Sequence, residues 1–271
     1  MIPLEDNFAD VIGKAQRGLR LSDVELAEKA RVSSQKIVKL RQGEFDELAL
    51  MRVAGVLNLA SRALCELAAG EYRPNKEELD GLAQVTTRYH DTTVNAYLVW
   101  DKGSKAAVAF DTGADSTELL AAAKKAGAAI KTILITHAHP DHVADLPRLR
   151  EETGAKVYAP SREPVAGAEE IDEGKEFKFG KLRIDTRLTW GHSRGGLTFV
   201  VHGLARPVAI VGDSLFAGSM GGGSVSYEDA VQNNLQKILT LPENTIICPG
   251  HGPMTTVGEE RVHNPFFAGK T

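Results

Sequence analysis

Apolar positions in the first quarter of the chain recur every three or four residues, which is the spacing of an amphipathic helix. The first predicted helix shows this most clearly, at Phe8, Val11, Ile12 and Ala15. Ser22 and Ser33 can each cap a further helix, and two more helices are expected over 48–57 and 61–68. Residues 1–70 are therefore predicted to form an all-helical domain.

From about Gly81 the pattern changes to short apolar runs of the strand type, separated by helical segments. Helices are expected over 117–126, from His142 to about residue 152, and over 227–239. The apolar runs predict strands near 92–100, 106–110, 155–158, 182–188, 197–202, 207–211 and 245–248. Between the two patterns lies a polar, proline-containing stretch. The chain is thus expected to consist of a helical domain, a linker over 71–82 and a mixed α/β domain over 83–271.

Composition excludes several classes of protein. The 271 residues are 42% hydrophobic and 25% charged, as in soluble globular proteins, and they suffice for one large and one small domain. A net charge of −4 gives no global basic field that would attract nucleic acid. No apolar run reaches the length of a membrane span, and the first residues do not read as a signal peptide. Cys65 and Cys248 fall in different predicted domains, so we expect no disulfide and a cytoplasmic protein without membrane contact.

Four polar residues crowd into a segment that directly follows a short apolar strand, 133–135. They are His137, His139, Asp141 and His142. In a loop these side chains can converge on one point, whereas in a strand they would alternate between faces. Imidazole nitrogens and carboxylate oxygens are ligands that zinc, iron and manganese accept. The segment is therefore predicted to bind metal.

This His-x-His-x-Asp-His pattern resembles the signature of the metallo-β-lactamase superfamily of metallohydrolases. The resemblance implies three further ligands at later strand ends, and the chain has residues of the required types in order at His192, Asp213 and His251. It also implies the fold, a four-layer αββα sandwich with the metal ions at one edge of its two sheets.

The resemblance assigns the seven residues to two metal ions. The first ion would be held by His137, His139 and His192, and the second by Asp141, His142 and His251, with Asp213 bridging both. Two zinc ions are expected, and iron or manganese also suits these ligands. A hydroxide that bridges the two ions would attack an electrophilic carbonyl, so that Asp141 and Asp213 serve catalysis as well as metal binding.

Two segments narrow the resemblance to the small glyoxalase-II-like branch, namely 212–221 and the tail 255–266. This branch implies a thioester hydrolase similar to hydroxyacylglutathione hydrolase, with a small thioester as substrate. Asp213 argues against a true β-lactam hydrolase, in which the corresponding ligand is typically Cys or absent. Glyoxalase II carries a cation that helps to hold glutathione where this chain has Gly222. Only 20 residues follow His251, so we expect no glutathione-binding helical domain of the glyoxalase II kind.

The run from Ser22 to Glu44 resembles the helix-turn-helix of the lambda repressor and Cro family. The resemblance implies DNA contacts from the second helix of that motif, at Ser34, Gln35, Lys36, Lys39 and Arg41. Arg31 stands where the family usually has Gly, and Asp23 stands near a usual phosphate-contacting Gln. Residues 1–70 contain ten basic and ten acidic residues, so the domain is neutral overall. DNA binding and assembly, for example as a homodimer, therefore both remain open.

Two other functions remain open for the α/β domain. One is a mononuclear iron persulfide dioxygenase, in which His137, His139 or His192 would join Asp213 in a site of two histidines and one carboxylate. The other is a transcriptional regulator that senses a ligand through the metal domain. The complete ligand set favours an enzyme over a regulator, and the intact second site favours two ions over one.

Overall fold

The computed structural model of the protein describes residues 2–270. Five helices come first: α1 (Phe8–Gly18), α2 (Asp23–Ala30), α3 (Ser34–Arg41), α4 (Glu47–Val56) and α5 (Ser61–Ala68). The predicted helix-capping residues act as expected, since the side chains of Ser22 and Ser33 accept hydrogen bonds from the backbone N–H groups of Glu25 and Lys36. Arg31 ends α2 in the left-handed conformation with φ 54°, which is strained for a residue other than glycine.

The first sheet has the strand order β1-β2-β3-β4-β5-β6. Its strands are β1 (Leu82–Tyr89), β2 (Thr92–Trp100), β3 (Ala106–Phe110), β4 (Ala129–Leu134), β5 (Lys156–Pro160) and β6 (Glu169–Ile171). β1, β2 and β3 pair antiparallel, and β3 to β6 pair parallel. The parallel part is connected through α6 (Thr117–Ala126), α7 (Pro140–Val143) and α8 (Leu146–Thr153).

The second sheet has the order β12-β11-β10-β9-β8-β7. Its strands are β7 (Glu176–Phe179), β8 (Leu182–Leu188), β9 (Leu197–His202), β10 (Val208–Gly212), β11 (Ile246–Pro249) and β12 (Thr255–Thr256). All pairs are antiparallel except β10 with β11. Helix α9 (Tyr227–Asn233) continues into the π-helix η1 (Asn234–Ile238), and α10 (Val257–His263) follows β12.

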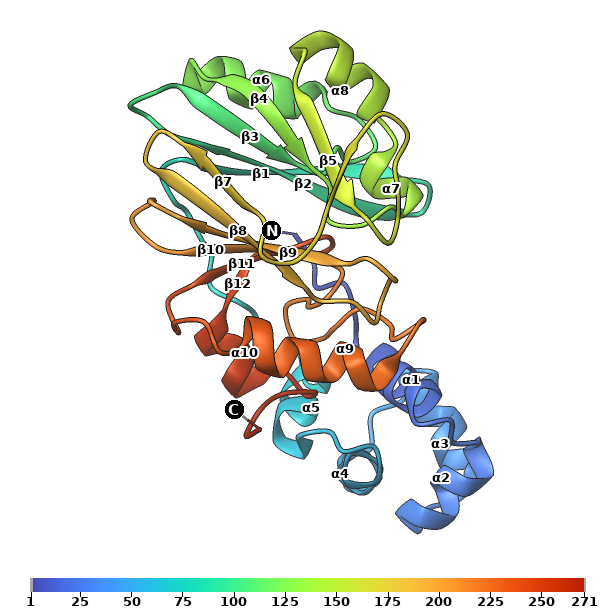
Figure 1. Ribbon diagram of the computed structural model, residues 1–271. Coiled ribbons are helices and arrows are strands. Elements are labelled where there is room, and N and C mark those ends of the chain that lie inside the picture. Colours follow the sequence, from blue (N-terminus) through green and yellow to red (C-terminus); the bar gives the residue numbers. More distant parts are fainter. Residues whose placement is uncertain (1, 271) are drawn as a thin grey trace.

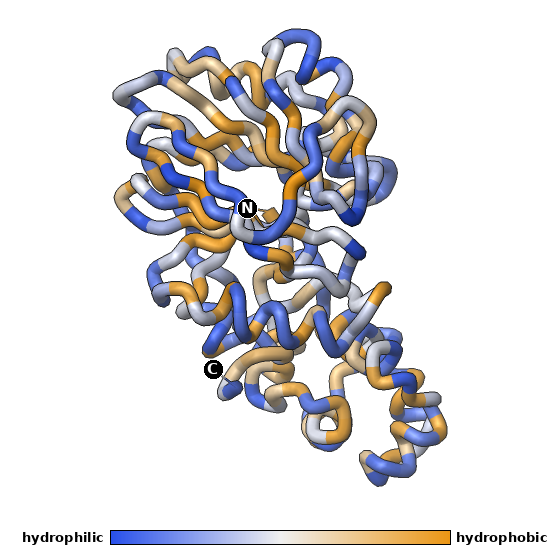
Figure 2. The backbone as a smooth tube through the Cα atoms, viewed as in Figure 1, coloured by the Kyte–Doolittle hydropathy of each residue, from blue (hydrophilic) through white to orange (hydrophobic). Residues whose placement is uncertain are grey.

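Three apolar cores separate four layers, which Figure 1 shows as helices outside two stacked sheets. One core fills the space between the sheets and includes Phe110 and Phe199, whose ring centroids lie 5.5 Å apart. A second core packs α6 and α8 against the first sheet. The orange segments of the tube in Figure 2 follow these buried strands, while outer loops are blue. The mixed α/β sandwich expected from the sequence is therefore present.

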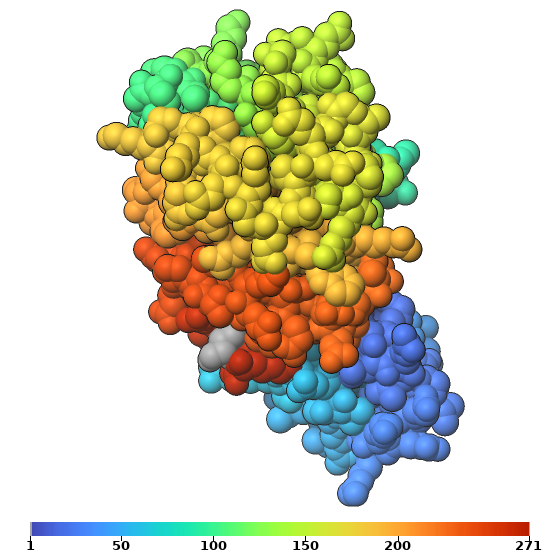
Figure 3. All heavy atoms as spheres, viewed as in Figure 1, coloured from blue at the N-terminus to red at the C-terminus, as the bar shows by residue number. Residues whose placement is uncertain are grey.

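The third core is shared between the outer face of the second sheet, α9, α10 and the N-terminal helices. Tyr227 of α9 packs directly on α1, because a Cβ at Gly18 would lie 2.2 Å from its ring. Tyr72, in the segment predicted as a polar linker, is buried and donates a hydrogen bond of 2.7 Å to Glu260. Figure 3 shows the helical region in blue lying against the orange and red C-terminal segments. The helices thus pack closely on the sandwich.

Two local predictions were wrong. Strand β1 was not predicted, because its residues alternate poorly and its hairpin turn has His90 at φ 51° where glycine or asparagine usually signals the turn. The helix predicted from His142 to residue 152 is two helices, α7 and α8, interrupted near Asp145. The Asp145 side chain instead accepts hydrogen bonds from the Ser116 backbone and hydroxyl at 2.8 and 2.6 Å. Over residues 2–270, no helix combines the length and apolarity needed to cross a bilayer.

Candidate metal centre

The ends of four strands bring the seven predicted ligands to one edge of the two sheets. The first four lie in the loop after β4 and in α7, and the others follow β8, β10 and β11. Their ligand atoms form two groups, one of His137, His139, His192 and Asp213 and one of Asp141, His142 and His251. Within each group, all ligand atoms lie within 4.8 Å of one another. The structure therefore brings together all seven residues that were singled out from the sequence.

The carboxylate of Asp213 lies at the centre of this cluster and is 7% exposed. Its Oδ2 atom is 3.3 Å from Nε2 of His192 and 3.3 Å from Nε2 of His251. Its Oδ1 atom is 3.4 Å from Nε2 of His142. One carboxylate thus faces histidines of both groups, as a bridging ligand must.

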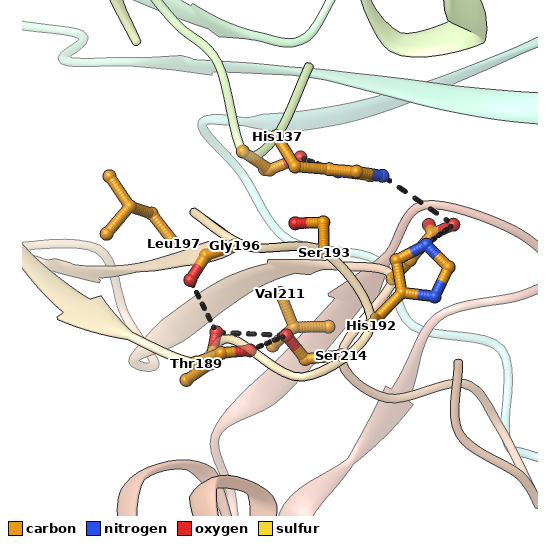
Figure 4. Close-up of a pocket in the computed structure, with 10 residues that line it drawn as sticks. His137, Thr189, His192, Ser193, Gly196, Leu197, Val211 and Ser214 are labelled. Carbon is orange, nitrogen blue, oxygen red and sulfur yellow. Dashed lines mark hydrogen bonds and ion pairs between the residues drawn. The ribbon is translucent and has the colours of Figure 1, made fainter. Parts of the chain in front are cut away.

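The three histidines of the first group converge on a small volume. Nδ1 of His139 lies 3.0 Å from Nε2 of His137 and 3.1 Å from Nε2 of His192. Figure 4 shows the His137 and His192 rings directed toward the same place, with the hydrogen-bonded side chains of Thr189 and Ser214 lower in the view. The Ser214 hydroxyl donates to the Thr189 carbonyl at 3.1 Å, which fixes the loop that follows Asp213. The arrangement leaves three nitrogens aimed at one point.

Hydrogen bonds on the far side of the rings fix their orientation. Nδ1 of His142 lies 2.7 Å from Asp111 Oδ2, and Nδ1 of His192 lies 3.0 Å from the Gly222 carbonyl oxygen. Nδ1 of His251 is 2.5 Å from the Thr93 carbonyl oxygen. An acceptor at Nδ1 keeps the proton on that nitrogen and leaves the Nε2 lone pair free for a metal ion.

Two polar atoms in the cluster favour a bound cation. His142 Nε2 and Asp213 Oδ1 are buried and have no hydrogen-bond partner within the described chain. Buried polar atoms without a partner are costly, and a metal ion would satisfy both. Burial lowers the pKa of His137 well below its ordinary value, which keeps this imidazole neutral as a ligand must be. The donors therefore fit a divalent metal ion, and their chemistry alone does not choose which one.

Two close backbone approaches show how tightly the ligand loops are packed. A Cβ at Gly250 would lie 2.1 Å from Asp213 Oδ1 and 2.7 Å from His142 Cε1. A Cβ at Gly221 would lie 1.8 Å from the Asp213 carbonyl oxygen. Glycine at both positions lets the loops meet around the carboxylate without displacing it.

Sequence reasoning did not identify Asp111 as part of the site. Its carboxylate is 2% exposed and accepts hydrogen bonds of 2.8 Å from both the backbone and the hydroxyl of Thr136, as well as contacting His142. It adopts a left-handed φ of 56° at the end of β3, at the same sheet edge as the ligands. An acidic residue directly after a buried parallel strand was the signal that could have revealed it.

The residues predicted to contact DNA lie apart from this centre, on and beside α3. Ser34 and Gln35 are exposed there. Three of the cations are engaged within the helical region, because Lys36 pairs with Asp46 at 2.7 Å, Lys39 with Glu44 at 2.8 Å and Arg41 with Asp23 at 3.3 Å. This surface is consequently less basic than its sequence suggests.

Comparisons with known proteins agree with the geometry. Residues 91–251, more than half of the chain, match the sequence model of the Metallo-beta-lactamase superfamily. The chain is similar to the hydroxyacylglutathione hydrolase GloC of Haemophilus influenzae, with 29% identity over 65% of this chain and 94% of that protein. It resembles the crystal structure of the BLEG-1 B3 metallo-beta-lactamase, with 28% identity, a TM-score of 0.60 and coverage of 69% and 100%. It also resembles TTHA1623 in a di-iron-bound form, with 28% identity, a TM-score of 0.57 and coverage of 68% and 100%.

Proposed function

Because this chain belongs to the metallo-beta-lactamase superfamily, we propose that it is a hydrolase of small thioesters that depends on two metal ions. The observation that carries the proposal is the Asp213 carboxylate, which faces histidines of two separate ligand groups. A single-ion site would not need both groups. The first ion would be held by His137, His139 and His192 and the second by Asp141, His142 and His251, with Asp213 within reach of both.

The bound ions supply Lewis acidity and lower the pKa of a coordinated water toward about 7. The protein's part is to hold neutral imidazoles in one orientation and to offset charge with Asp141 and Asp213. Asp111, the Thr93 carbonyl and the Gly222 carbonyl fix three of the rings through Nδ1. These acceptors fix the orientation and the tautomer of the imidazole rings before a metal ion binds. No serine or cysteine nucleophile is required, and Cys248 is buried between the sheets.

A thioester is the favoured substrate class because of the likeness to the H. influenzae GloC hydrolase. Glutathione itself is not favoured as the thiol part. Gly222 supplies no cation, and the space beside it is open, since a Cβ there would meet only the Ser224 hydroxyl at 3.7 Å. We therefore expect acyl-glutathione to be hydrolysed no faster than other thioesters. The substitution Gly222→Arg should raise the rate for acyl-glutathione selectively.

The test is release of thiol from a panel of acyl thioesters by metal-loaded and chelator-treated protein. We expect hydrolysis that is lost with the chelator and restored by zinc. Asp213→Ala provides a control in which both ions lose a ligand. No thiol release from any thioester by protein that carries two ions would overturn the proposal.

An iron enzyme is the second candidate, supported by the similarity to the di-iron-bound TTHA1623. Iron in place of zinc would also suit the alternative of a persulfide dioxygenase, in which two histidines and Asp213 hold one ion. Elemental analysis beside oxygen uptake on glutathione persulfide separates the two. Oxygen consumption that requires one iron per chain would favour the dioxygenase over the hydrolase.

For the N-terminal region we propose a helix-turn-helix made of α2 and α3, with Ser34, Gln35, Lys36, Lys39 and Arg41 toward DNA. The two helices are joined by a short turn at Arg31, which supports the motif. The three ion pairs on this face oppose strong phosphate binding and favour the alternative, a protein contact such as a homodimer. Selection on random duplexes at about 0.1 M salt decides between them. An enriched motif whose affinity falls steeply with salt supports DNA, whereas no motif from an intact dimer supports assembly.

A further inference from the structure

The first residues of the chain reach the metal centre from outside the matched family region. A Cβ at Gly252, next to the ligand His251, would lie 3.2 Å from the Glu5 backbone nitrogen and 3.6 Å from the Pro3 carbonyl oxygen. In Figure 1 the chain starts beside the two sheets and only then runs to α1. We call residues 2–7 the N-terminal arm. The arm packs against the loop that carries His251.

The loop that follows the ligand Asp213 also contacts the arm. Asp6 is 8% exposed, forms an ion pair with Lys14 and accepts a hydrogen bond of 2.5 Å from the Ser219 hydroxyl. Lys14 also donates to the Met220 carbonyl at 2.9 Å. Ser219 and Met220 lie in the loop after Asp213. The arm is therefore held between the loops of two metal ligands, and its place there is set by buried polar contacts.

Glu5 lies in the middle of the arm, and its carboxylate is not paired with another group in the part of the chain that the structure describes. Among residues 2–270, its carboxylate has no hydrogen-bond or ion-pair partner, whereas the neighbouring Asp6 is fully engaged. Burial raises the pKa of Glu5, and His251 and Asp213 lie close enough to act on it electrostatically. A partly buried carboxylate without a partner is unfavourable. Its position beside the metal centre suggests that a substrate group supplies the partner.

Space for such a group exists beside the arm. An open groove of about 1090 Å³ is lined by Glu5 together with Leu4, Tyr72, Pro253 and Met254. Pro253 and Met254 follow His251 by two and three residues, so this end of the groove lies beside the loop that carries that ligand. The apolar part of this lining suits a carbon chain. The charged residues that line the groove are Glu5, Asp6, Asp10, Arg73, Lys76 and Glu77, of which Asp6, Lys76 and Glu77 are engaged in ion pairs with other residues.

We propose that the N-terminal arm forms a wall of the active site and that Glu5 selects thioesters carrying a cationic group near the scissile bond. The inference rests on the proposed thioester hydrolase. Glu5 is a specificity-determining residue here, since it meets the substrate and takes no part in bond cleavage. The same charge disfavours anionic thiols, in keeping with the lack of a cation at Gly222.

The test compares three acetyl thioesters of nearly equal size. Their thiol parts are thiocholine, its neutral carbon analogue 3,3-dimethylbutanethiol, and anionic 3-mercaptopropionate. Wild-type protein should prefer the cationic over the neutral thioester about tenfold in kcat/KM. Glu5→Gln should abolish that preference, mainly through KM, and Glu5→Asp should restore part of it. Glu71→Gln is the matched control, because Glu71 is exposed between groove residues and should leave the preference unchanged.

A second readout does not depend on turnover. Binding of the unreactive thioether of thiocholine, measured by calorimetry on metal-loaded protein, should weaken about tenfold in Glu5→Gln with the metal content unchanged. Equal kcat/KM for all three thioesters in wild type and variant would overturn the inference while leaving the hydrolase intact. Loss of bound metal in Glu5→Gln would also overturn it, because Glu5 would then serve the ions. No hydrolysis of any thioester would instead refute the proposed function.

Discussion

Asp111→Asn should weaken the second metal site selectively. The Asp111 carboxylate is buried, and its Oδ2 atom lies 2.7 Å from His142 Nδ1 and 2.8 Å from the Thr136 hydroxyl. Asparagine has nearly the same shape and tolerates the left-handed φ of 56°. It can keep one oxygen toward the Thr136 backbone, but it then presents an NH2 group to His142. That group favours the His142 tautomer with its proton on Nε2, the nitrogen needed for the metal.

The size of the effect follows from the bond that is lost. A hydrogen bond to a charged partner contributes about 1.5–3 kcal/mol, and loss of an outer partner of a metal-binding histidine typically costs about 10- to 100-fold in metal affinity. We expect a loss within that range at the site of His142. The site of His137, His139 and His192 should change by less than about threefold, because Asp111 contacts none of these rings directly.

Competition with a chromophoric chelator, which resolves two stepwise affinities, is the measurement. Asp115→Asn in the same turn is the control, because Asp115 is 61% exposed and its only ion pair among residues 2–270 is with Arg148. Unchanged affinity at both sites in Asp111→Asn, or a loss confined to the first site, would refute this account of how His142 is oriented.

Three further predictions concern the ligand loops and the buried carboxyl group of Glu260. Asp213→Ala should lower metal uptake at both sites, whereas His251→Ala should mainly empty the second, as counted by elemental analysis of dialysed protein. Gly250→Ala should reduce metal affinity at least tenfold, because its Cβ would lie 2.1 Å from Asp213 Oδ1; Gly55→Ala, in open space within α4, should leave metal binding unchanged. Burial raises the pKa of Glu260 to about 7, so the folded state holds a proton that the unfolded state releases near pH 4.5. Wild-type stability should consequently fall as pH rises from about 4.5 to 7, by up to about 3 kcal/mol. In Glu260→Gln this dependence of the unfolding free energy on pH should vanish, as measured by urea unfolding at pH 5 and pH 8. An equal pH dependence in both proteins would contradict the raised pKa of Glu260.

The sandwich and the ligand cluster could be predicted from the sequence because both produce local sequence patterns. His137, His139, Asp141 and His142 are close in the chain, and each later candidate follows an apolar run that ends at the same sheet edge. The spacing of the motifs was therefore enough to predict most residues of the site. The family resemblance supplied the layer order, which strand patterns alone do not determine.

What the sequence did not reveal depends on contacts between distant segments. Strand β1 is held by pairing with β2, through a turn whose left-handed residue is His90, so it has no turn signal of its own. Asp111 orients His142 from 31 positions away. The N-terminal arm lies beside Gly252, and Asp6 and Lys14 connect it to the loop after Asp213. Such pairings become visible only when the chain is folded.

The most direct test of the central claim is a titration of metal-stripped protein with zinc, in which bound ions per chain and thioester hydrolysis are followed in the same sample. The account predicts that uptake and hydrolysis both level off at about two ions per chain. A plateau of uptake at one ion, or two bound ions without any thioester hydrolysis, would contradict it.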